Sequence, residues 1–261
     1  MRFSIITATK NSEKFLQENI DSVKKQTFND FEHVFIDGYS SDNTVEIIKK
    51  YQKEHPQKVR LYQYSPQGIS HAMNKGIEKA KGEFINHLHA DDSFHDSTVL
   101  QDVADFLTKN EELDWIYSRA DVINAGGNYL HTYPNKPLLH YHDHTSWWGR
   151  YLMKLTTFIP HQAVFIKKSV FDKHGTFDEN LSSKMDTDMW IRILNKTNWS
   201  FYNRIICNYR VHKQAQSSSK ENIKENQRNL RRVQKRYLNH IELTVARVLN
   251  LIKSWRNTDQ Q

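Results

Sequence analysis

The feature that most constrains the fold is a regular alternation of short apolar runs with amphipathic segments over the first 90 or so residues. The apolar runs, each of which predicts a buried strand, span residues 3–8, 31–36, 59–64 and 84–88. The segments between them carry apolar residues at helical spacing and span residues 13–26, 42–54 and 69–80. This order predicts an α/β fold with a Rossmann-like, mostly parallel sheet that is flanked by helices on both faces.

The second half of the chain is less regular. Its apolar spacing predicts helices and short strands at residues 99–109, 115–117, 164–166, 169–174 and 186–196. Residues 133–160 are rich in aromatic side chains, histidine and proline and show little periodicity, which predicts a loop-heavy surface. Residues 213–220 form a polar break, and after it the pattern predicts a helical extension to about residue 255.

Composition and charge restrict the class of protein. The 37 Lys and Arg residues exceed the 30 Asp and Glu residues by seven, and residues 221–261 hold nine of the former and four of the latter. A basic tail of this kind can bind anionic lipid or nucleic acid, or can simply be a solvated helix face. No run approaches the roughly 18 apolar residues of a transmembrane helix. The single cysteine, Cys207, fits a buried position in a protein of the reducing cytoplasm.

Carboxylates follow two of the predicted strands. Asp37 ends the second strand and the pair Asp91-Asp92 follows the fourth. Ligands of open α/β sheets bind beyond the carboxyl ends of the strands, so these side chains should share one crevice. Adjacent carboxylates repel each other unless a divalent cation joins them to a diphosphate, and Mg²⁺ or Mn²⁺ suits such oxygen ligands. The alternative for Asp91-Asp92 alone is a helix N-cap in a turn.

An ordered set of motifs extends this pattern. In the first half these are residues 5–12 (IITATKNS), 36–44 (IDGYSSDNT), 68–76 (GISHAMNKG), 81–85 (KGEFI) and 89–92 (HADD). In the second half they are residues 160–165 (PHQAVF), 175–179 (GTFDE) and 186–192 (DTDMWIR). In this order and spacing, residues 3–212 closely resemble family 2 glycosyltransferases of the GT-A fold, as found in bacterial polysaccharide synthesis. The resemblance implies a metal-dependent, hexosyltransferase-type enzyme that uses Mn²⁺ or Mg²⁺.

The resemblance also implies roles for single residues. Those expected to bind the nucleotide-sugar are Thr9, Asn11, Asp37, Asn74, Asp91, His161 and His212. Those expected to bind the metal are Asp91 and Asp92. Asp186 falls where inverting members carry the general base, which takes the proton of the acceptor hydroxyl as that oxygen attacks the anomeric carbon. Asp188 points elsewhere on the same helix and can pair with Arg192 four residues later.

The sequence departs from the family at several positions. His89 stands where relatives carry an acid, and Gly38, Pro66 and His71 also replace acidic residues. A neutral His89 can hydrogen-bond a phosphate or sugar, or can simply fill space.

The resemblance divides the chain into three parts. Residues 1–100 form the nucleotide-sugar-binding half, 101–215 the acceptor-binding half of the same domain, and 216–261 a basic helical tail. The tail is amphipathic, so it can lie on an anionic membrane surface, pack on the core or join a homodimer. His140, His142 and His144 alternate, which on a strand would bring them together as a zinc site, although an acceptor loop is the alternative.

The resemblance implies an inverting glycosyltransferase that moves a sugar from a nucleoside diphosphate donor, with UDP as the first candidate, to a saccharide or lipid-linked saccharide acceptor. It also implies a pathway of surface polysaccharide, lipopolysaccharide or capsule assembly, and a location in the cytoplasm at the inner face of the membrane. One alternative is a nucleotidyltransferase, which would need a glycine-rich phosphate loop that residues 7–12 lack. The other is a basic nucleic-acid-binding protein, for which the charge is placed poorly, so no nucleic acid is expected as a partner.

Overall fold

The structure is a computed structural model that describes all residues except 135–142, 157–158, 213–219 and 247–261. Its first half alternates strands and helices in the order β1 (Phe3–Thr9), α1 (Glu13–Lys24), β2 (Phe31–Asp37), α2 (Thr44–Glu54), β3 (Val59–Gln63), α3 (Ile69–Lys79) and β4 (Phe84–His87). The strand bounds agree with the sequence prediction to within about one residue. The α/β alternation predicted from the periodicity is therefore confirmed.

The second half supplies the other strands and the remaining helices. They are β5 (Ser93–Phe94), α4 (Val99–Lys109), β6 (Trp115–Ile123), β7 (Tyr129–Tyr133), α5 (Trp147–Thr156), the short 3₁₀ helix η2 (His161–Ala163), β8 (Val164–Lys167), α6 (Lys168–His174), α7 (Met185–Ile193), β9 (Trp199–Arg210) and α8 (Lys220–Tyr237). All the described strands join one sheet in the order β3-β2-β1-β4-β8-β6-β9-β5, with β7 paired to β6.

The sheet is parallel where the chain alternates strand and helix, and mixed elsewhere. Strand β1 pairs in parallel with β2 and with β4, and β2 pairs in parallel with β3. Strand β8 runs antiparallel to both β4 and β6, whereas β9 runs parallel to β6. The carboxyl ends of β1, β2 and β4 therefore lie along one edge, which is where the sequence placed its candidate site.

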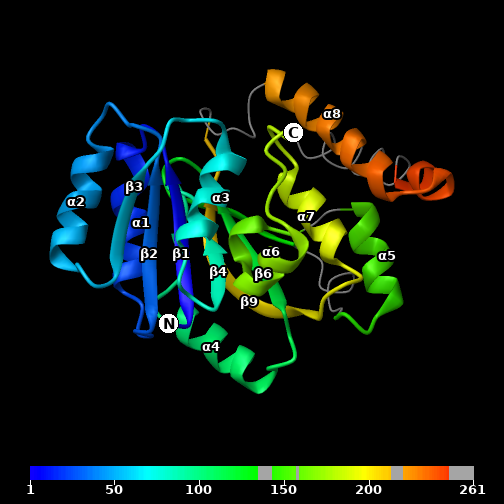
Figure 1. Ribbon diagram of the computed structural model, residues 1–261, viewed down its shortest axis with the longest axis horizontal. Helices are drawn as coiled ribbons and strands as arrows, with labels where there is room; N and C mark the ends of the chain where they lie inside the picture. Colours follow the sequence, from blue (N-terminus) through cyan, green and yellow to red (C-terminus); the bar gives the residue numbers. More distant parts are fainter. Residues whose placement is uncertain (135–142, 157–158, 213–219, 247–261) are drawn as a thin grey trace.

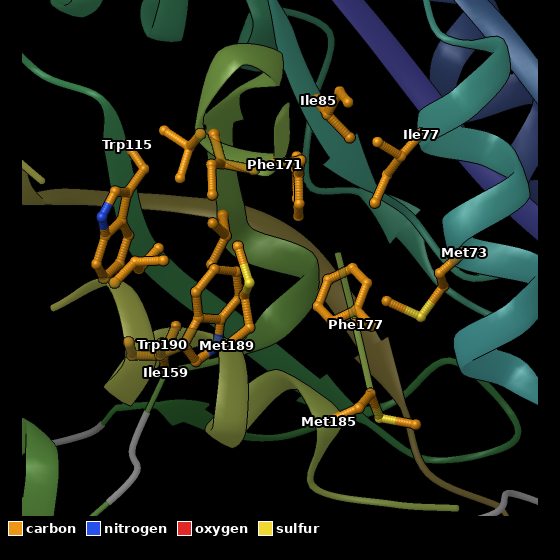
Figure 2. Packing of buried hydrophobic residues seen from close by; sticks show 14 of the residues in the cluster. Met73, Ile77, Ile85, Trp115, Ile159, Phe171, Phe177, Met185, Met189 and Trp190 are labelled. Atoms are coloured by element: carbon orange, nitrogen blue, oxygen red, sulfur yellow. The ribbon is translucent and has the colours of Figure 1, made fainter. Parts of the chain in front are cut away.

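Helices cover both faces of the sheet, which explains the nearly continuous apolar strands (Figure 1). Val34 and Ile36 of β2 share a buried cluster with α3, while Phe35 between them packs against residues of α1 and α2. The first cluster continues under α7, and Figure 2 shows Met73 of α3 pointing toward Phe177 within it. This alternation fixes the register of β2, because a slip of one residue would exchange its two faces.

Three features of the second half differ from the prediction. Residues 147–156, expected to lie in a loop-heavy stretch, form α5. Strand β9 of 12 residues was not predicted at all, and β6 is 9 residues long where only residues 115–117 were expected. Most of β9 lacks a clean two-residue alternation because its pairing with β6 contains register shifts. Such irregular pairing removes the period-2 signal on which strand prediction depends.

The tail is helical, as predicted, but it is not a single helix. Helix α8 ends at Tyr237, and the chain is helical again from residue 240 to residue 246. Asn239 and Glu242 exchange side-chain-to-backbone hydrogen bonds of 2.9 Å, which is the capping-box arrangement of a helix start. The predicted helix beyond residue 246 lies outside the described residues. Within the described part of the chain, no helix combines the length and apolarity needed to cross a bilayer.

Gly82 offers a test of how tightly the central strands are packed. A Cβ atom at this position would lie 2.4 Å from the backbone nitrogen of Ser4 and 2.5 Å from the carbonyl carbon of Phe3. Because backbone atoms of a central strand cannot give way, Gly82→Ala should lower the free energy of unfolding by about 2–3 kcal/mol. Urea denaturation measures this loss.

Gly126→Ala is the matched control, since the nearest atom to its added Cβ is the Asn124 side-chain oxygen at 3.4 Å. The control should stay within about 0.5 kcal/mol of wild type. Equal stability of the Gly82 and Gly126 variants would contradict the close approach.

Candidate functional site

Two cavities meet at the carboxyl edge of the sheet. One, here called the Asp91 cavity, has a volume of about 590 Å³ and is lined by the loop after β1, by residues 89–91 and by His212. The other, called the Asp186 cavity, has a volume of about 350 Å³ and lies between α3, η2 and the start of α7. Their linings share four residues, namely Ile69, His89, Gln162 and Tyr209. A ligand could therefore extend from one into the other.

Asp91 lies on the wall of its cavity beside His212. The distance between Asp91 Oδ2 and His212 Nε2 is 2.9 Å, and both side chains retain some exposure to solvent. The imidazole also packs on the ring of Phe15, with the ring centroids 5.1 Å apart. Residues 91 and 212 are far apart in the chain, yet they place a carboxylate and an imidazole at one point.

Asp92 points into the protein instead. Its side chain is buried, and its Oδ1 accepts a hydrogen bond of 2.8 Å from the backbone N–H of Arg210. Burial and the neighbouring Asp91 carboxylate raise the pKa of Asp92 well above its usual range. Asp92 does not line either cavity. This geometry argues against the sequence-based assignment of Asp92 as a metal ligand and leaves Asp91 as the carboxylate that faces the cavity.

Arg210, at the end of β9, holds the segment that contains Asp91 and Asp92 in place. Its Nε donates to the carbonyl oxygen of Asp91 at 3.0 Å, and its Nη2 lies 2.5 Å from a carboxylate oxygen of Glu18 in α1. Its guanidinium also lies over the ring of Phe15, 4.8 Å from the centroid. Arg210 was not among the residues predicted to form the site. The available signal was its position in the stretch Tyr209–His212, which precedes the predicted polar break.

Asp37 and Thr9 are not exposed to the cavities, contrary to expectation. Asp37 is fully buried and accepts hydrogen bonds from Thr9 Oγ1 at 3.0 Å, from the backbone and hydroxyl of Ser40 at 3.0 and 2.5 Å, and from Gln63 at 3.1 Å. Burial alone would raise the pKa of the Asp37 carboxyl, but the bonds from Ser40, Gln63 and Thr9 outweigh it and hold the pKa below its usual value. In this structure Asp37 is a fixed anchor between two loops.

Asn11 does line the Asp91 cavity. Its backbone adopts the left-handed conformation, with φ of 51°, which asparagine tolerates better than most residues. Its side-chain oxygen accepts a hydrogen bond of 2.9 Å from the backbone N–H of Ser41, and its own N–H donates to the Ser40 hydroxyl at 2.9 Å. The loops after β1 and β2 are thus joined at the rim of the cavity.

Asn74 was expected to bind the nucleotide-sugar, and its contacts show a different use. Its Nδ2 donates to the carbonyl oxygen of Phe177 at 2.9 Å and to the Glu179 carboxylate at 2.8 Å, while its Oδ1 accepts from the Phe177 N–H at 2.9 Å. The amide therefore fastens α3 to the segment 177–179. Asn74 lines neither cavity, so a structural role explains it better.

Asp186 lies at the start of α7 on the wall of its own cavity. Its Oδ1 accepts a hydrogen bond of 2.7 Å from the N–H of Thr187. Asp188 turns away, as predicted: it is buried and contacts Arg236 at 2.9 Å, Tyr237 at 3.1 Å and Arg192 at 3.8 Å. Asp186 alone of the two carboxylates faces the cavity, which suits a base that acts on a bound hydroxyl.

Three histidine rings stack beside the two cavities. The centroids of His87 and His161 are 5.3 Å apart, and those of His89 and His161 are 5.7 Å apart. His161 lines the Asp186 cavity, as expected of a ligand-binding residue, and His89 lines both. Burial, assisted by His89 and opposed by Asp186, lowers the pKa of His161 to about 4. Burial likewise lowers the pKa of His87 and His89, so the stack is neutral at pH 7.

The alternative zinc site at the alternating histidines falls mostly outside the described residues. His140 and His142 lie outside the described residues, and His144 Nδ1 lies 3.2 Å from the carbonyl oxygen of Trp199. Among the described residues, no group of three or more His, Cys, Asp or Glu side chains is arranged to hold a metal ion. A metal at the Asp91 cavity would therefore take part of its coordination from a ligand or water.

Replacing His161 by phenylalanine tests its buried neutral state. Because the pKa of His161 is about 4 in the folded protein against 6.5 ordinarily, the unfolded chain binds more protons between these values. The free energy of unfolding therefore falls as the pH drops from about 6.5 toward 4. From pH 7 to pH 5, His161→Phe should lose less of this free energy than wild type, by on the order of 1–2 kcal/mol.

Urea titrations at both pH values check this difference. His131→Phe, at an exposed position of β7, is the control and should keep the wild-type dependence on pH. Identical pH dependence in wild type and His161→Phe would show that His161 titrates normally.

The chain is similar in sequence to known glycosyltransferases. The model of the family described as Glycosyl transferase family 2 matches residues 4–175. A PGL/p-HBAD biosynthesis glycosyltransferase of Mycobacterium bovis (strain BCG / Pasteur 1173P2) is 31% identical over 193 residues, which cover 73% of this chain and 68% of the relative. The poly(ribitol-phosphate) β-N-acetylglucosaminyltransferase TarS of Staphylococcus aureus (strain MW2) is 35% identical over 129 residues, which cover 49% of this chain and 22% of TarS.

Solved structures show the same fold. Residues 1–349 of S. aureus TarS in complex with UDP-GlcNAc align with a TM-score of 0.71 at 21% identity, covering 89% of this chain and 65% of that one. The mannosyltransferase PcManGT of Pyrobaculum calidifontis, in complex with GDP-Man and Mn²⁺, aligns with a TM-score of 0.63 at 17% identity, covering 82% of this chain and 58% of that one. The chain therefore belongs to glycosyltransferase family 2 and has the GT-A fold.

Proposed function

We propose that this glycosyltransferase moves a hexosyl group from a UDP-linked donor to a hydroxyl of a saccharide or lipid-linked saccharide acceptor, with inversion. The observation that carries the proposal is the meeting of two cavities, one with Asp91 and His212 and the other with Asp186, across the shared residues His89 and Gln162. The Asp91 cavity would hold the nucleoside diphosphate and the Asp186 cavity the acceptor. In support, neighbours of the same fold were solved with UDP-GlcNAc and with GDP-Man.

The residues of the Asp91 cavity fit a divalent cation. Asp91 and His212 offer one carboxylate and one imidazole, with 2.9 Å between their nearest atoms. Mg²⁺ and Mn²⁺ are commonly held by one or two protein carboxylates together with substrate phosphates and water. Asp91 and His212 would hold such an ion against the diphosphate. When bound, the ion would neutralise the negative charge that develops on the leaving diphosphate.

The protein groups at the Asp186 cavity supply the other half of the reaction. Asp186 would accept the proton of the acceptor hydroxyl while the hydroxyl oxygen forms a bond to the anomeric carbon. The bond between that carbon and the diphosphate oxygen breaks as the new bond forms, and the nucleoside diphosphate departs. Attack from the face opposite the leaving group inverts the anomeric configuration. The neutral rings of His89 and His161 can exchange hydrogen bonds with sugar hydroxyls without adding charge.

The names of the relatives support an acceptor in surface glycan or glycolipid assembly. One takes part in PGL/p-HBAD biosynthesis and another glycosylates poly(ribitol phosphate). Membership of a glycosyltransferase family sets aside the nucleotidyltransferase and the nucleic-acid-binding protein as alternatives. A location at the inner face of the membrane would suit such an acceptor and belongs to this proposal.

UDP binding tests the assignment of Asp91. Calorimetry should show that Mn²⁺ strengthens UDP binding to the wild-type protein. Asp91→Asn should lose most of this gain, because it removes the carboxylate that faces the cavity. Asp92→Asn is the matched control: it can still accept the Arg210 N–H bond and should retain the gain. Wild-type UDP binding that does not respond to Mn²⁺ or Mg²⁺ would count against a metal-dependent enzyme.

Turnover tests the assignment of Asp186. A screen of UDP-sugars for donor turnover should identify the sugar, and Asp186→Asn should then lower kcat by at least about 100-fold. UDP affinity should not change, because Asp186 lies outside the Asp91 cavity. Turnover of Asp186→Asn within about tenfold of wild type would exclude Asp186 as the base.

A further inference from the structure

Helix α8 carries a concentrated positive charge on its outward face. Between residues 224 and 236 the sequence has six Lys and Arg residues and one acid, Glu225. Their spacing of three and four residues along the helix brings most of the cations onto one side, and all are exposed: Lys224, Arg228, Arg231, Arg232, Lys235 and Arg236. The opposite side is buried through Asn229 and Val233. We call Lys224, Arg228, Arg231, Arg232 and Lys235 the α8 basic row.

The basic row is largely free of internal partners. The ion pairs that these α8 side chains form within the described part of the chain involve Arg228, which lies 3.8 Å from Glu225, and Arg236, which contacts Asp178 and Asp188. Arg236 is therefore engaged in holding α8 to α7. Lys224, Arg231, Arg232 and Lys235 form no ion pair with a described residue. A helix of this length places the first and last cations of the row about 16 Å apart.

A third cavity lies between the basic row and the Asp186 cavity. This cavity of about 310 Å³ lies between α8 and the start of α3, and Arg228 and Arg232 form part of its wall. It shares Ser182 and Ile69 with the Asp186 cavity. Asn226 of α8 also lines the Asp186 cavity. A chain-like ligand lying along α8 would thus pass from the basic row to the carboxylate proposed as the base.

Two carboxylates in the third cavity are already engaged. Glu179 accepts hydrogen bonds from Asn74 at 2.8 Å and lies 3.1 Å from the His71 ring nitrogen. Glu225 accepts a hydrogen bond of 2.5 Å from the Ser182 hydroxyl. Arg232 has no such partner among the described residues, so its charge is available to a ligand.

We propose that the α8 basic row and the third cavity bind a polyanionic acceptor, a chain of polyol units joined by phosphodiesters, and guide its free hydroxyl to Asp186. This inference rests on the proposed function, whose acceptor class it narrows. Arginine guanidinium groups pair with phosphate in a bidentate manner, and a row of them matches a ligand with repeated phosphates. The glycosylation of poly(ribitol phosphate) by the relative TarS supports this choice.

A membrane surface fits the row less well. A helix that lies in a bilayer interface needs an apolar face toward the lipid. The exposed positions of α8 from residue 224 to residue 236 are Lys, Gln and Arg only, because its apolar side chains are used against the protein core. A flexible charged polymer requires no such insertion.

Three substitutions in the row test the proposal. The triple variant R231Q/R232Q/K235Q removes three charges from α8. The triple variant K49Q/K50Q/K53Q, at exposed positions of α2 that line none of the described cavities, is the control with the same change in net charge. Binding of a fluorescent poly(ribitol phosphate) oligomer is measured by anisotropy with the full chain, and binding to phosphatidylglycerol vesicles is measured by sedimentation.

The α8 variant should bind the oligomer at least roughly tenfold more weakly than wild type, because fewer counterions are released from the polyanion. The control should stay within about twofold of wild type, since its charges lie elsewhere. An equal loss in both triples, or no binding by wild type, would refute the proposal. Vesicle binding that needs the row while oligomer binding does not would instead identify α8 as a membrane contact. UDP calorimetry on all three proteins separates a failure of this inference from a failure of the proposed function, because a wild-type protein that does not bind UDP would contradict the proposed function itself.

Discussion

The active-site edge of this protein depends on one buried cation. Arg210 is only 2% exposed, and a guanidinium in that position needs partners for its donors. These partners come from three separate segments: the Glu18 carboxylate, the carbonyl oxygen of Asp91 and the carbonyl oxygens of residues 124 and 125. Its backbone N–H adds a fourth contact, to Asp92. The end of β9 is thereby fixed against α1 and the segment after β4, which places His212 beside Asp91.

The contacts of Arg210 explain why two adjacent aspartates have different environments. Asp92 is drawn inward to accept the Arg210 N–H, so its side chain faces the interior. Asp91 is held through its backbone carbonyl, which leaves its side chain directed to the cavity and to His212. Of this pair of carboxylates, Asp92 joins the segment after β4 to β9, and Asp91 is the one proposed to hold the metal. The repulsion between the neighbouring carboxylates remains, and burial together with this repulsion raises the pKa of Asp92.

The sequence predicted those elements whose apolar residues recur at a regular spacing within a short stretch of chain. The strands β1 to β4 and the helices between them follow from periodic apolar residues over windows of a dozen positions or fewer. Strand β9 did not, because its pairing with β6 is irregular and joins residues about 85 positions apart, as at Ile116 and Ser200. Asp186 was assigned through the resemblance to the family, since a helix start alone would indicate only an N-cap, and its separation from Asp188 followed from helical geometry. The burial of Asp37 and the hydrogen bonds by which Asn74 joins α3 to residues 177–179 depend on contacts between residues far apart in the chain. Short sequence motifs carry no information about such contacts.

The same limit applies to the tail, whose sequence suggests only a basic amphipathic helix. The structure shows how the tail is attached to the rest of the protein. Asp188 of α7, two residues after Asp186, is buried and contacts Arg236 and Tyr237 of α8. A buried carboxylate with these partners resists displacement, because losing Arg236 would leave the more distant Arg192, at 3.8 Å, as its paired cation. The helix that carries the proposed base and the helix that carries the basic row therefore hold a fixed relation. A polymer bound along α8 would meet Asp186 in one constant register, so binding energy gained far from the reacting bond could position the acceptor hydroxyl.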